Sequence, residues 1–533
     1  MLDKSDFIIY AVAGVIFAAY IGSLSTTIAG GDSGEIVAEG CHLGTAHPPG
    51  YPLITMIINV ISRIDTLGSV AYRVNIFCAA CTVLAAVFLG KTVQMLHPSK
   101  SAVGAIIAMG MFSFSPLIWQ YAITAEVFPL NTMFAALILY LVVLFSKSNT
   151  NIAIAYAGAF ICGLALCNQH TIVLFEVPLI VWMLFLLRSY ITANPSTFLF
   201  LSVSFIAGLL PYAYLPISSV YSPKPGSWGQ VDTLSGFLHH ILRKDYGTFQ
   251  LFSGEQGKTA EGFGARNAAF LTDFVGLQTG LSDVKEWNDY GTACLAVVVL
   301  GMCACVWQLP WGNTGKGRKG LVSDVKKTVT SPEKSSGKAA KRNEITSQTL
   351  DSSTTKPASN TSVPESKLSL CPYECSITPI ILVLTLVFYF TVFHSLSNLP
   401  LKDRLLYGIH QRFWMQPNII MFAFMGVGVN AVLSALSHML LQGSQKSNKN
   451  QTTNNTMKKT DKNKTDKSDE IKGTEGKVSS LVRVCVFVIH ALFWSLAVYV
   501  ILTQYRTWLP ILDMSDNTHF KDYASAVLSP LSP

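Results

Sequence analysis

The chain has 533 residues, of which 50% are hydrophobic and only 13% are charged. In soluble domains about a quarter of all residues are charged, so this composition excludes an ordinary soluble protein. The formal net charge of +8 lies mostly in two polar linkers, which argues against nucleic-acid binding. Repeated apolar runs near the ~20 residues that cross a bilayer instead predict an all-α polytopic membrane protein.

The apolar runs predict eleven transmembrane helices, and their boundaries lie near residues 7–28, 71–96, 102–121, 127–146, 152–168, 171–188, 197–217, 292–309, 377–397, 414–440 and 481–503. The first run is too long for a cleavable signal peptide, so we expect a signal anchor. Residues 51–64 are apolar but short, which predicts a helix that lies at the interface or re-enters. If this segment instead spans the membrane, every later side assignment is reversed.

The domain organisation follows from these spans and the polar stretches between them. We expect an N-terminal membrane module with two loops, a basic linker, two helices joined by a turn, a Lys-rich linker, and a last helix with a short tail. The N-terminal module comprises residues 1–311, with its loops at 29–70 and 218–291, and the basic linker comprises residues 312–376. The two helices and their turn (398–413) comprise residues 377–440, the Lys-rich linker residues 441–480, and the last helix with its tail residues 481–533. Both linkers are rich in Ser, Thr and Asn and poor in aromatics, so they are predicted to be disordered.

The basic residues predict the orientation. The two linkers and the short turns at Lys100, Lys147 and Arg188 fall on one side in an eleven-span count, and the positive-inside rule places that side in the cytosol with the N-terminus. The loops, the turn and the C-terminal tail then lie on the opposite, lumenal side. The unusual polar and aromatic residues of the chain therefore converge on one face.

This orientation predicts the glycosylation state of four Asn-x-Ser/Thr sequons, at Asn360, Asn450, Asn454 and Asn463. All four lie in the linkers assigned to the cytosol, where N-glycans are not added. Endoglycosidase treatment should therefore leave the electrophoretic mobility of the protein unchanged. A shift that depends on any of these asparagines would reverse the assigned orientation.

The first loop holds two carboxylates in a glycine-rich stretch, Asp32 and Glu35, directly after the first apolar run. Carboxylates at a membrane rim are candidates for function. Asp32 is the leading candidate for a general base, and Glu35 is predicted to orient Asp32. His47 and Tyr51 follow within a Pro-rich turn. An ordinary polar loop with solvated acids is the alternative.

Further candidates flank later spans on the same side. Glu126 lies at the end of a span, and Asn168 and His170 interrupt two apolar runs, although a helix-end acid and a simple hairpin turn would explain them equally. In loop 218–291, His239 and Arg243 share one helix face beside Trp228. A helix that contacts lipid headgroups is the alternative there. Adjacent histidines point in different directions on a helix, so no metal site is expected.

The turn 398–413 carries Arg404, His410 and Arg412 ahead of Trp414. Arg412 precedes a span on the lumenal side, against the positive-inside trend, and an arginine there needs a partner. The forked donors of arginine suit a phosphate. Trp414 alone is typical of the aromatic belt of a membrane protein.

Several of these motifs together resemble the transmembrane protein 260 family. They are Asp32-Ser33-Gly34-Glu35, Ala46-His47-Pro48-Pro49-Gly50-Tyr51-Pro52, Ala125-Glu126-Val127-Phe128, Asn168-Gln169-His170, Pro211-Tyr212-Ala213-Tyr214-Leu215-Pro216 and His410-Gln411-Arg412-Phe413-Trp414. The resemblance implies a GT-C-type protein O-mannosyltransferase of the endoplasmic reticulum membrane. It also implies dolichyl phosphate mannose as donor substrate and IPT domains of plexin-type receptors as acceptors, with no cofactor or metal.

The resemblance further implies roles for the candidate residues. Asp32 would be the catalytic base, and Arg412 would bind the donor phosphate with support from Arg404, His410 or Arg243. The residues expected to line the substrate pocket are His47, Tyr51, Glu126, Asn168, His170, Trp228, His239 and Trp414. Two alternatives stay open: a transferase with the same donor that acts on a lipid-linked glycan, and a transporter. The transporter is disfavoured because the acids and bases crowd one rim and no internal repeat is evident.

Overall fold

The structure, a computed structural model, describes residues 4–99, 101–147, 151–248, 250, 260–279, 289–307, 377–457, 480–519, 521–522 and 525. These residues form helices and connecting loops, and they include no strand. The predicted all-α polytopic membrane fold is confirmed. The whole linker predicted at 312–376, and residues 458–479 of the second linker, lie outside the described residues.

Every apolar run predicted to span coincides with a helix. Within the described part of the chain, eight helical stretches are long and apolar enough to cross a bilayer. They are built on α1 (Lys4–Gly22), α4 (Val70–Leu96), α7 (Val127–Lys147), α9 (Val173–Ala193), α14 (Asp289–Trp307), α17 (Thr378–Leu396), α19 (Met415–Met457) and α20 (Ser480–Leu512).

Two further runs are bent pairs of helices. The helices α5 (Ala102–Ser113) and α6 (Pro116–Ala122) meet at 68°, and α10 (Ser196–Gly208) meets the stretch that contains α11 (Tyr214–Tyr221) at 45°. If each pair counts as one span, the described chain has up to ten. The remaining helix, α8 (Ile152–Leu166), has only 15 residues, so the predicted count of eleven is not confirmed.

Local sequence explains where several helices begin. The side chains of Ser69, Ser101, Asn151, Thr233 and Asp403 each accept a hydrogen bond from a backbone N–H in the first turn of the helix that follows. Such caps satisfy donors that have no partner inside the helix. They start the long helices α4, α5 and α8, and also the short helices α12 (Leu234–Ile241) and α18 (Arg404–Gln411).

The helices pack closely where glycines face one another. A Cβ on Gly104 of α5 would lie 2.1 Å from the carbonyl oxygen of Gly426 in α19, and a Cβ on Gly163 of α8 would lie 2.1 Å from that of Phe205 in α10. Small residues allow this approach, which drives helix association inside a membrane. The buried centre of the bundle comprises α4, α5, α7 and the first part of α19, whereas α20 exposes most of its apolar side chains.

One predicted boundary is wrong. The tenth span was expected to end near residue 440, but α19 continues to Met457, so residues 441–457 are helical rather than part of a disordered linker. No proline interrupts this stretch, and a polar sequence without a proline can extend an existing helix. Asn450 and Asn454 therefore lie in α19, while Asn360 and Asn463 fall outside the described residues.

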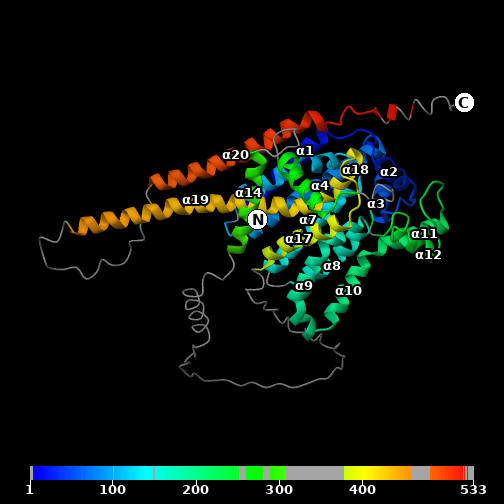
Figure 1. Cartoon of the computed structure of the whole chain (residues 1–533), viewed down its shortest axis with the longest axis horizontal. Helices are drawn as coiled ribbons and strands as arrows, with labels where there is room; N and C mark the ends of the chain where they lie inside the picture. The colour runs from blue at the N-terminus through cyan, green and yellow to red at the C-terminus, as the bar shows by residue number, and fades with distance from the viewer. Residues whose placement is uncertain are drawn as a thin grey trace, which may run out of the picture.

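The segments predicted to share one face do meet at one end of the bundle. There lie α2 (Ser33–His42), α3 (Pro52–Ser62), α11, α12 and α18 (Figure 1). With eleven residues, α3 has about half the length of a spanning helix. The chain after α20 reaches the same end, where the Met514 N–H donates to the Ser23 carbonyl at 3.1 Å and the Thr27 hydroxyl donates to the Asn517 carbonyl at 3.3 Å.

Candidate functional site

A polar cavity of about 160 Å³ lies where these segments meet. It draws on parts of the chain that are far apart in sequence, from the α2 region to the start of α19. Its lining comprises Asp32, Ile36, His47, Tyr51, Val127, Phe128, Gln169, Arg243, Tyr246, Ile409, Arg412 and Phe413. Five of the residues predicted from the sequence are therefore brought together in one cavity.

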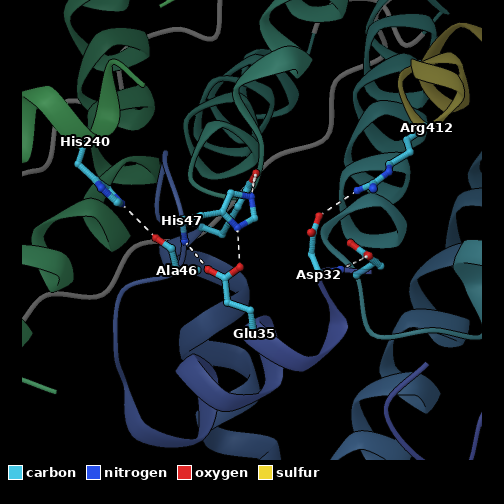
Figure 2. A network of polar contacts seen from close by, with 8 residues as sticks. Asp32, Glu35, Ala46, His47, His240 and Arg412 are labelled. Atoms are coloured by element: carbon cyan, nitrogen blue, oxygen red, sulfur yellow. Dashed lines mark hydrogen bonds and ion pairs between the residues drawn. The ribbon is translucent and has the colours of Figure 1, made fainter. Parts of the chain in front are cut away.

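The central contact of the cavity is an ion pair between Asp32 and Arg412. Arg412 donates through Nη1 to Asp32 Oδ2 at 2.9 Å (Figure 2). The Asp32 side chain is 37% exposed and that of Arg412 14% exposed, so the pair lies at the edge of the packed interior. Asp32 also occupies the N-cap position of α2, where the helix dipole favours a carboxylate.

Two aromatic rings hold the guanidinium of Arg412 from the other side. Its centre lies 5.5 Å from the ring centroid of Phe128 and 6.0 Å from that of Tyr121. These distances are typical of cation–π contacts, which are stronger when the cation is partly desolvated. The buried Nε finds no hydrogen-bond partner among the described residues, so the arginine keeps donor capacity for a ligand.

Glu126 lies against the backbone of the acidic loop. Its side chain is 3% exposed, and Oε1 accepts the backbone N–H of Asp32 at 3.2 Å. Burial, with the nearby charge of Asp32 as the second cause, raises the pKa of Glu126 to about 8, against a smaller lowering by Arg412. Gly31 has a φ of +63°, and a Cβ there would stand 3.0 Å from Glu126 Oε1, so the loop needs a glycine at this position.

The raised pKa makes a prediction about stability. Below pH 4.5 Glu126 is protonated in both states, but between pH 4.5 and about 8 only the folded protein keeps the proton. The free energy of unfolding should therefore fall as pH rises through this window, by up to several kcal/mol, since each pKa unit corresponds to about 1.4 kcal/mol. We expect the melting temperature of Glu126→Gln in detergent to depend less on pH. Equal pH dependence in the two proteins would contradict the assignment.

Glu35 has a different partner from the one predicted. Its carboxylate accepts the backbone N–H of His47 at 2.6 Å and His47 Nδ1–H at 2.9 Å, so it orients His47 and not Asp32 (Figure 2). The chain folds back after α2, which brings residue 47 within reach. The His47 ring packs edge-on against Tyr51 and Trp228, with centroids 5.0 and 6.4 Å away.

Two cavity residues have backbone conformations that side chains rarely adopt. Tyr51 has a φ of +43° and Arg243 a φ of +52°. Left-handed conformations of bulky residues store strain and are concentrated at functional sites. Beside them, His240 is buried and its Nε2 contacts the Ala46 carbonyl at 3.1 Å, which ties α12 to the turn that carries His47.

A second, largely apolar cavity of about 590 Å³ lies next to the first. Arg243 lines both cavities, so it marks their junction. His170, predicted for the substrate pocket, lines the second cavity and bonds to the Tyr212 hydroxyl. The other lining residues are Leu166, Thr171, Val173, Leu174, Leu209, Ile241, Leu242, Thr248, Gln250, Val392, Phe393, Leu396 and Ser397.

Two of the residues predicted for the site are exposed instead. Arg404 lies on the surface of α18, and His239 lies on the surface of α12, where it pairs with Asp245 at 2.9 Å. Neither lines the cavity. Trp228 is also absent from the lining, but it touches the His47 ring from outside.

Three others are buried and serve packing. The Asn168 amide donates to the Val127 carbonyl at 2.9 Å, and Trp414 Nε1 donates to His394 at 3.0 Å. His410 Nδ1 contacts the Ser397 hydroxyl at 3.0 Å. These contacts hold the cavity walls, and none of the three side chains lines the cavity itself.

The structure adds residues that sequence reasoning missed. Gln169, Phe128 and Tyr246 line the cavity; the first two stand inside motifs of the resemblance but had no predicted role, and Tyr246 lies outside those motifs. Arg266 is buried and donates to the Leu399 carbonyl at 2.8 Å, while Asp273 accepts from Gln411. No local pattern marks these two, because what they hold is the turn that precedes Arg412.

The first part of the chain matches a known domain. Residues 32–193 match the family model described as the Protein O-mannosyl-transferase TMEM260 N-terminal domain. The match covers less than a third of the chain. The resemblance predicted from the motifs is thereby confirmed. Asp32, Glu126 and Gln169 lie inside the matched region, whereas Arg243 and Arg412 lie beyond it.

Relatives of the TMEM260 family extend the similarity along the chain. The mouse protein named Protein O-mannosyl-transferase TMEM260 is 41% identical over 301 residues, which cover 56% of this chain and 42% of the mouse protein. A Dictyostelium discoideum protein of the same name is 29% identical over 439 residues, which cover 78% of this chain and 44% of that protein. The chain thus matches less than half the length of each relative.

One solved structure is also similar. It is the crystal structure of ArnT from Cupriavidus metallidurans bound to undecaprenyl phosphate, at 12% identity and a TM-score of 0.46. The alignment covers 98% of this chain and 79% of that one.

Proposed function

We propose that this chain is a GT-C-type protein O-mannosyltransferase. It transfers mannose from dolichyl phosphate mannose to Ser or Thr hydroxyls of folded acceptor domains, such as the IPT domains of plexin-type receptors. The observation that carries the proposal is the cavity in which Asp32 faces Arg412 and Arg243. The names of the mouse and Dictyostelium relatives support the same activity.

The two adjoining cavities suit a donor with a polar head and a long apolar tail. The apolar cavity would hold the first part of the isoprenoid chain, and Arg243 at the junction would meet the phosphate. Arg412 would contact the phosphate from the opposite wall, because a guanidinium binds phosphate through two parallel donors. The sugar would then lie in the polar cavity beside Asp32.

The reaction we propose is a direct displacement at the anomeric carbon. A Ser or Thr hydroxyl is a poor nucleophile, so Asp32 takes its proton as it attacks. Arg412 and Arg243 stabilise the charge that develops on the departing phosphate. A phosphate that attracts Arg412 also weakens its hold on Asp32, so donor binding would free the carboxylate to act as a base. The proposal assigns no metal and no cofactor to this step.

The proposed location is the endoplasmic reticulum membrane, with the N-terminus in the cytosol and the C-terminus in the lumen. In this orientation the cavity opens on the lumenal side, where secretory acceptor domains fold. The basic turns support this orientation through the positive-inside rule. The end of the bundle that holds the cavity also holds the chain that follows α20.

The test is a transfer assay with the purified full chain in lipid nanodiscs. We expect mass spectrometry to find hexose on Ser or Thr of a folded IPT domain after incubation with dolichyl phosphate mannose. The Asp32→Asn protein serves as the negative control. Transfer to a lipid-linked glycan but not to the IPT domain would contradict the proposed acceptor, and transfer to neither would contradict the proposed function.

A further inference from the structure

Three side chains form a hydrogen-bonded relay in the wall of the polar cavity. The Glu35 carboxylate accepts a hydrogen bond from His47 Nδ1 at 2.9 Å, and His47 Nε2 lies 3.2 Å from the Tyr51 hydroxyl. A carboxylate has no proton to donate, so Nδ1 carries a proton, and Nε2 is the ring nitrogen that remains for other partners. The second bond from Glu35, to the backbone N–H of His47, fixes the ring further.

Two of the three residues of the relay line the polar cavity in which the reaction is proposed to occur. His47 and Tyr51 line the cavity with Asp32, Arg243 and Arg412. The His47 side chain is only 16% exposed, and its ring is held edge-on by Tyr51 and Trp228. Burial raises the pKa of the Tyr51 hydroxyl above its ordinary range, so this group remains a neutral hydrogen-bond partner.

A second His–carboxylate pair in the protein shows why position matters. His239 and Asp245 are also 2.9 Å apart, but their side chains are 49% and 53% exposed and lie outside the cavity. An exposed pair of this kind contributes little to stability and touches no substrate. The Glu35–His47 pair, by contrast, is partly buried, and its histidine lines a space that is also lined by two arginines. An oriented imidazole within reach of a reacting group is the usual agent of proton transfer.

We propose that His47, oriented by Glu35, is a general acid that protonates the departing lipid phosphate. This inference rests on the proposed function and adds a residue to it. In the structure His47 Nε2 contacts the Tyr51 hydroxyl at 3.2 Å. In the proposed step the ring carries a proton on each nitrogen, and a phosphate oxygen held by Arg243 and Arg412 takes the Nε2 proton. Glu35 supplies the counter-charge for the ring while it carries two protons.

The proton inventory of the reaction closes with this assignment. The hydroxyl oxygen of the acceptor bonds to the anomeric carbon, and its proton passes to Asp32. The bond between that carbon and the phosphate oxygen breaks with its electron pair on the oxygen, which takes the proton from His47 Nε2. The product lipid phosphate therefore leaves as a monoanion, and the proton on Asp32 returns to His47 across the cavity. No proton is gained or lost overall.

The experiment compares two donors in the same purified full-length protein. One is dolichyl phosphate mannose, and the other carries sulfur in place of a non-bridging phosphate oxygen, which makes the leaving group less basic. For His47→Gln we expect kcat with the natural donor to fall by about 10²–10⁴-fold with little change in KM. The loss should be much smaller with the sulfur donor, because its departure needs the proton less.

Two further variants keep the test decisive. His239→Gln removes the exposed histidine at the same distance from its acid and should retain wild-type kcat with both donors. Glu35→Gln keeps one acceptor oxygen for His47 and should show a smaller loss with the same dependence on the donor, and it replaces His47→Gln if that protein does not fold. An equal loss with both donors, or no loss, would overturn the proposal. A wild-type protein that transfers no mannose would instead contradict the proposed function itself.

Discussion

Replacing Asp32 by asparagine is expected to slow mannosyl transfer by about 10²–10⁴-fold, the usual cost of removing a general base. Asparagine keeps the size of the side chain and an oxygen for Arg412, which donates to Asp32 Oδ2 at 2.9 Å. It cannot take the hydroxyl proton of the acceptor. The donor should therefore still bind, so the loss should appear in kcat rather than in the dissociation constant of the donor.

Folding has to be measured on the same purified variant, because Asp32 also occupies the N-cap position of α2. A structural role would lower the melting temperature and leave turnover per folded molecule unchanged. Asp245→Asn is the matched control, since Asp245 is exposed, pairs with a histidine and lies outside the cavity. Full activity in Asp32→Asn would remove this residue from the reaction.

Replacing Arg412 by alanine is expected to lower kcat/KM for the donor by about 10²–10³-fold, as the loss of one donor to a developing oxyanion does elsewhere. The alanine protein loses both the contact to the phosphate and the partner of Asp32. Arg412→Lys should recover only part of the activity, because an ammonium group cannot bind phosphate through two parallel donors or stack on Phe128 in the same way.

Arg404→Ala is the control for this series. Arg404 lies eight residues earlier on the surface of α18, so its removal should change stability by no more than about 0.5 kcal/mol and leave kcat/KM near the wild-type value. Steady-state kinetics over a range of donor concentrations would separate the two variants. Equal behaviour of the two alanine proteins would mean that Arg412 has no special role at the phosphate.

Hydropathy was sufficient to place the long apolar helices. Inside a bilayer the backbone can satisfy its hydrogen bonds only in a helix or a closed barrel, so each apolar run of suitable length predicts a helix at that place. The bend between α5 and α6 was harder to predict from the sequence, although Ser115 and Pro116 mark the place where it occurs. The length of α19 could not be predicted, because a polar continuation of a helix has no apolar signal.

The last motif, residues 410–414, divides between the cavity and the packed interior. It lies at the end of α18, where the α-helix is followed by a 3₁₀ turn over Arg412–Trp414. Arg412 and Phe413 line the cavity together with Ile409. His410 and Trp414 are buried in the packed interior instead. The change of helix type within the motif removes the regular 3.6-residue period from which a shared face could be predicted.

The partners of the acidic residues were beyond sequence reasoning. Spacing along the chain suggested that Glu35 serves Asp32, yet its carboxylate meets His47 after the chain reverses. Arg412 and Glu126 reach Asp32 from 380 and 94 residues away. Such contacts depend on how the spans pack, and no local pattern encodes them.

The distance of 380 residues between Asp32 and Arg412 also sets an order of events during biosynthesis. At roughly 5–20 residues per second, a ribosome needs about 20–80 s to extend the chain from one to the other. Throughout that interval the acidic loop has been synthesised but lacks its cationic partner. The bonds of Met514 and Asn517 to the loop ahead of Asp32 form later still. The ion pair at the centre of the cavity can therefore form only after most of the chain has been synthesised, and any factor that delays insertion of the segment around Arg412 delays its assembly.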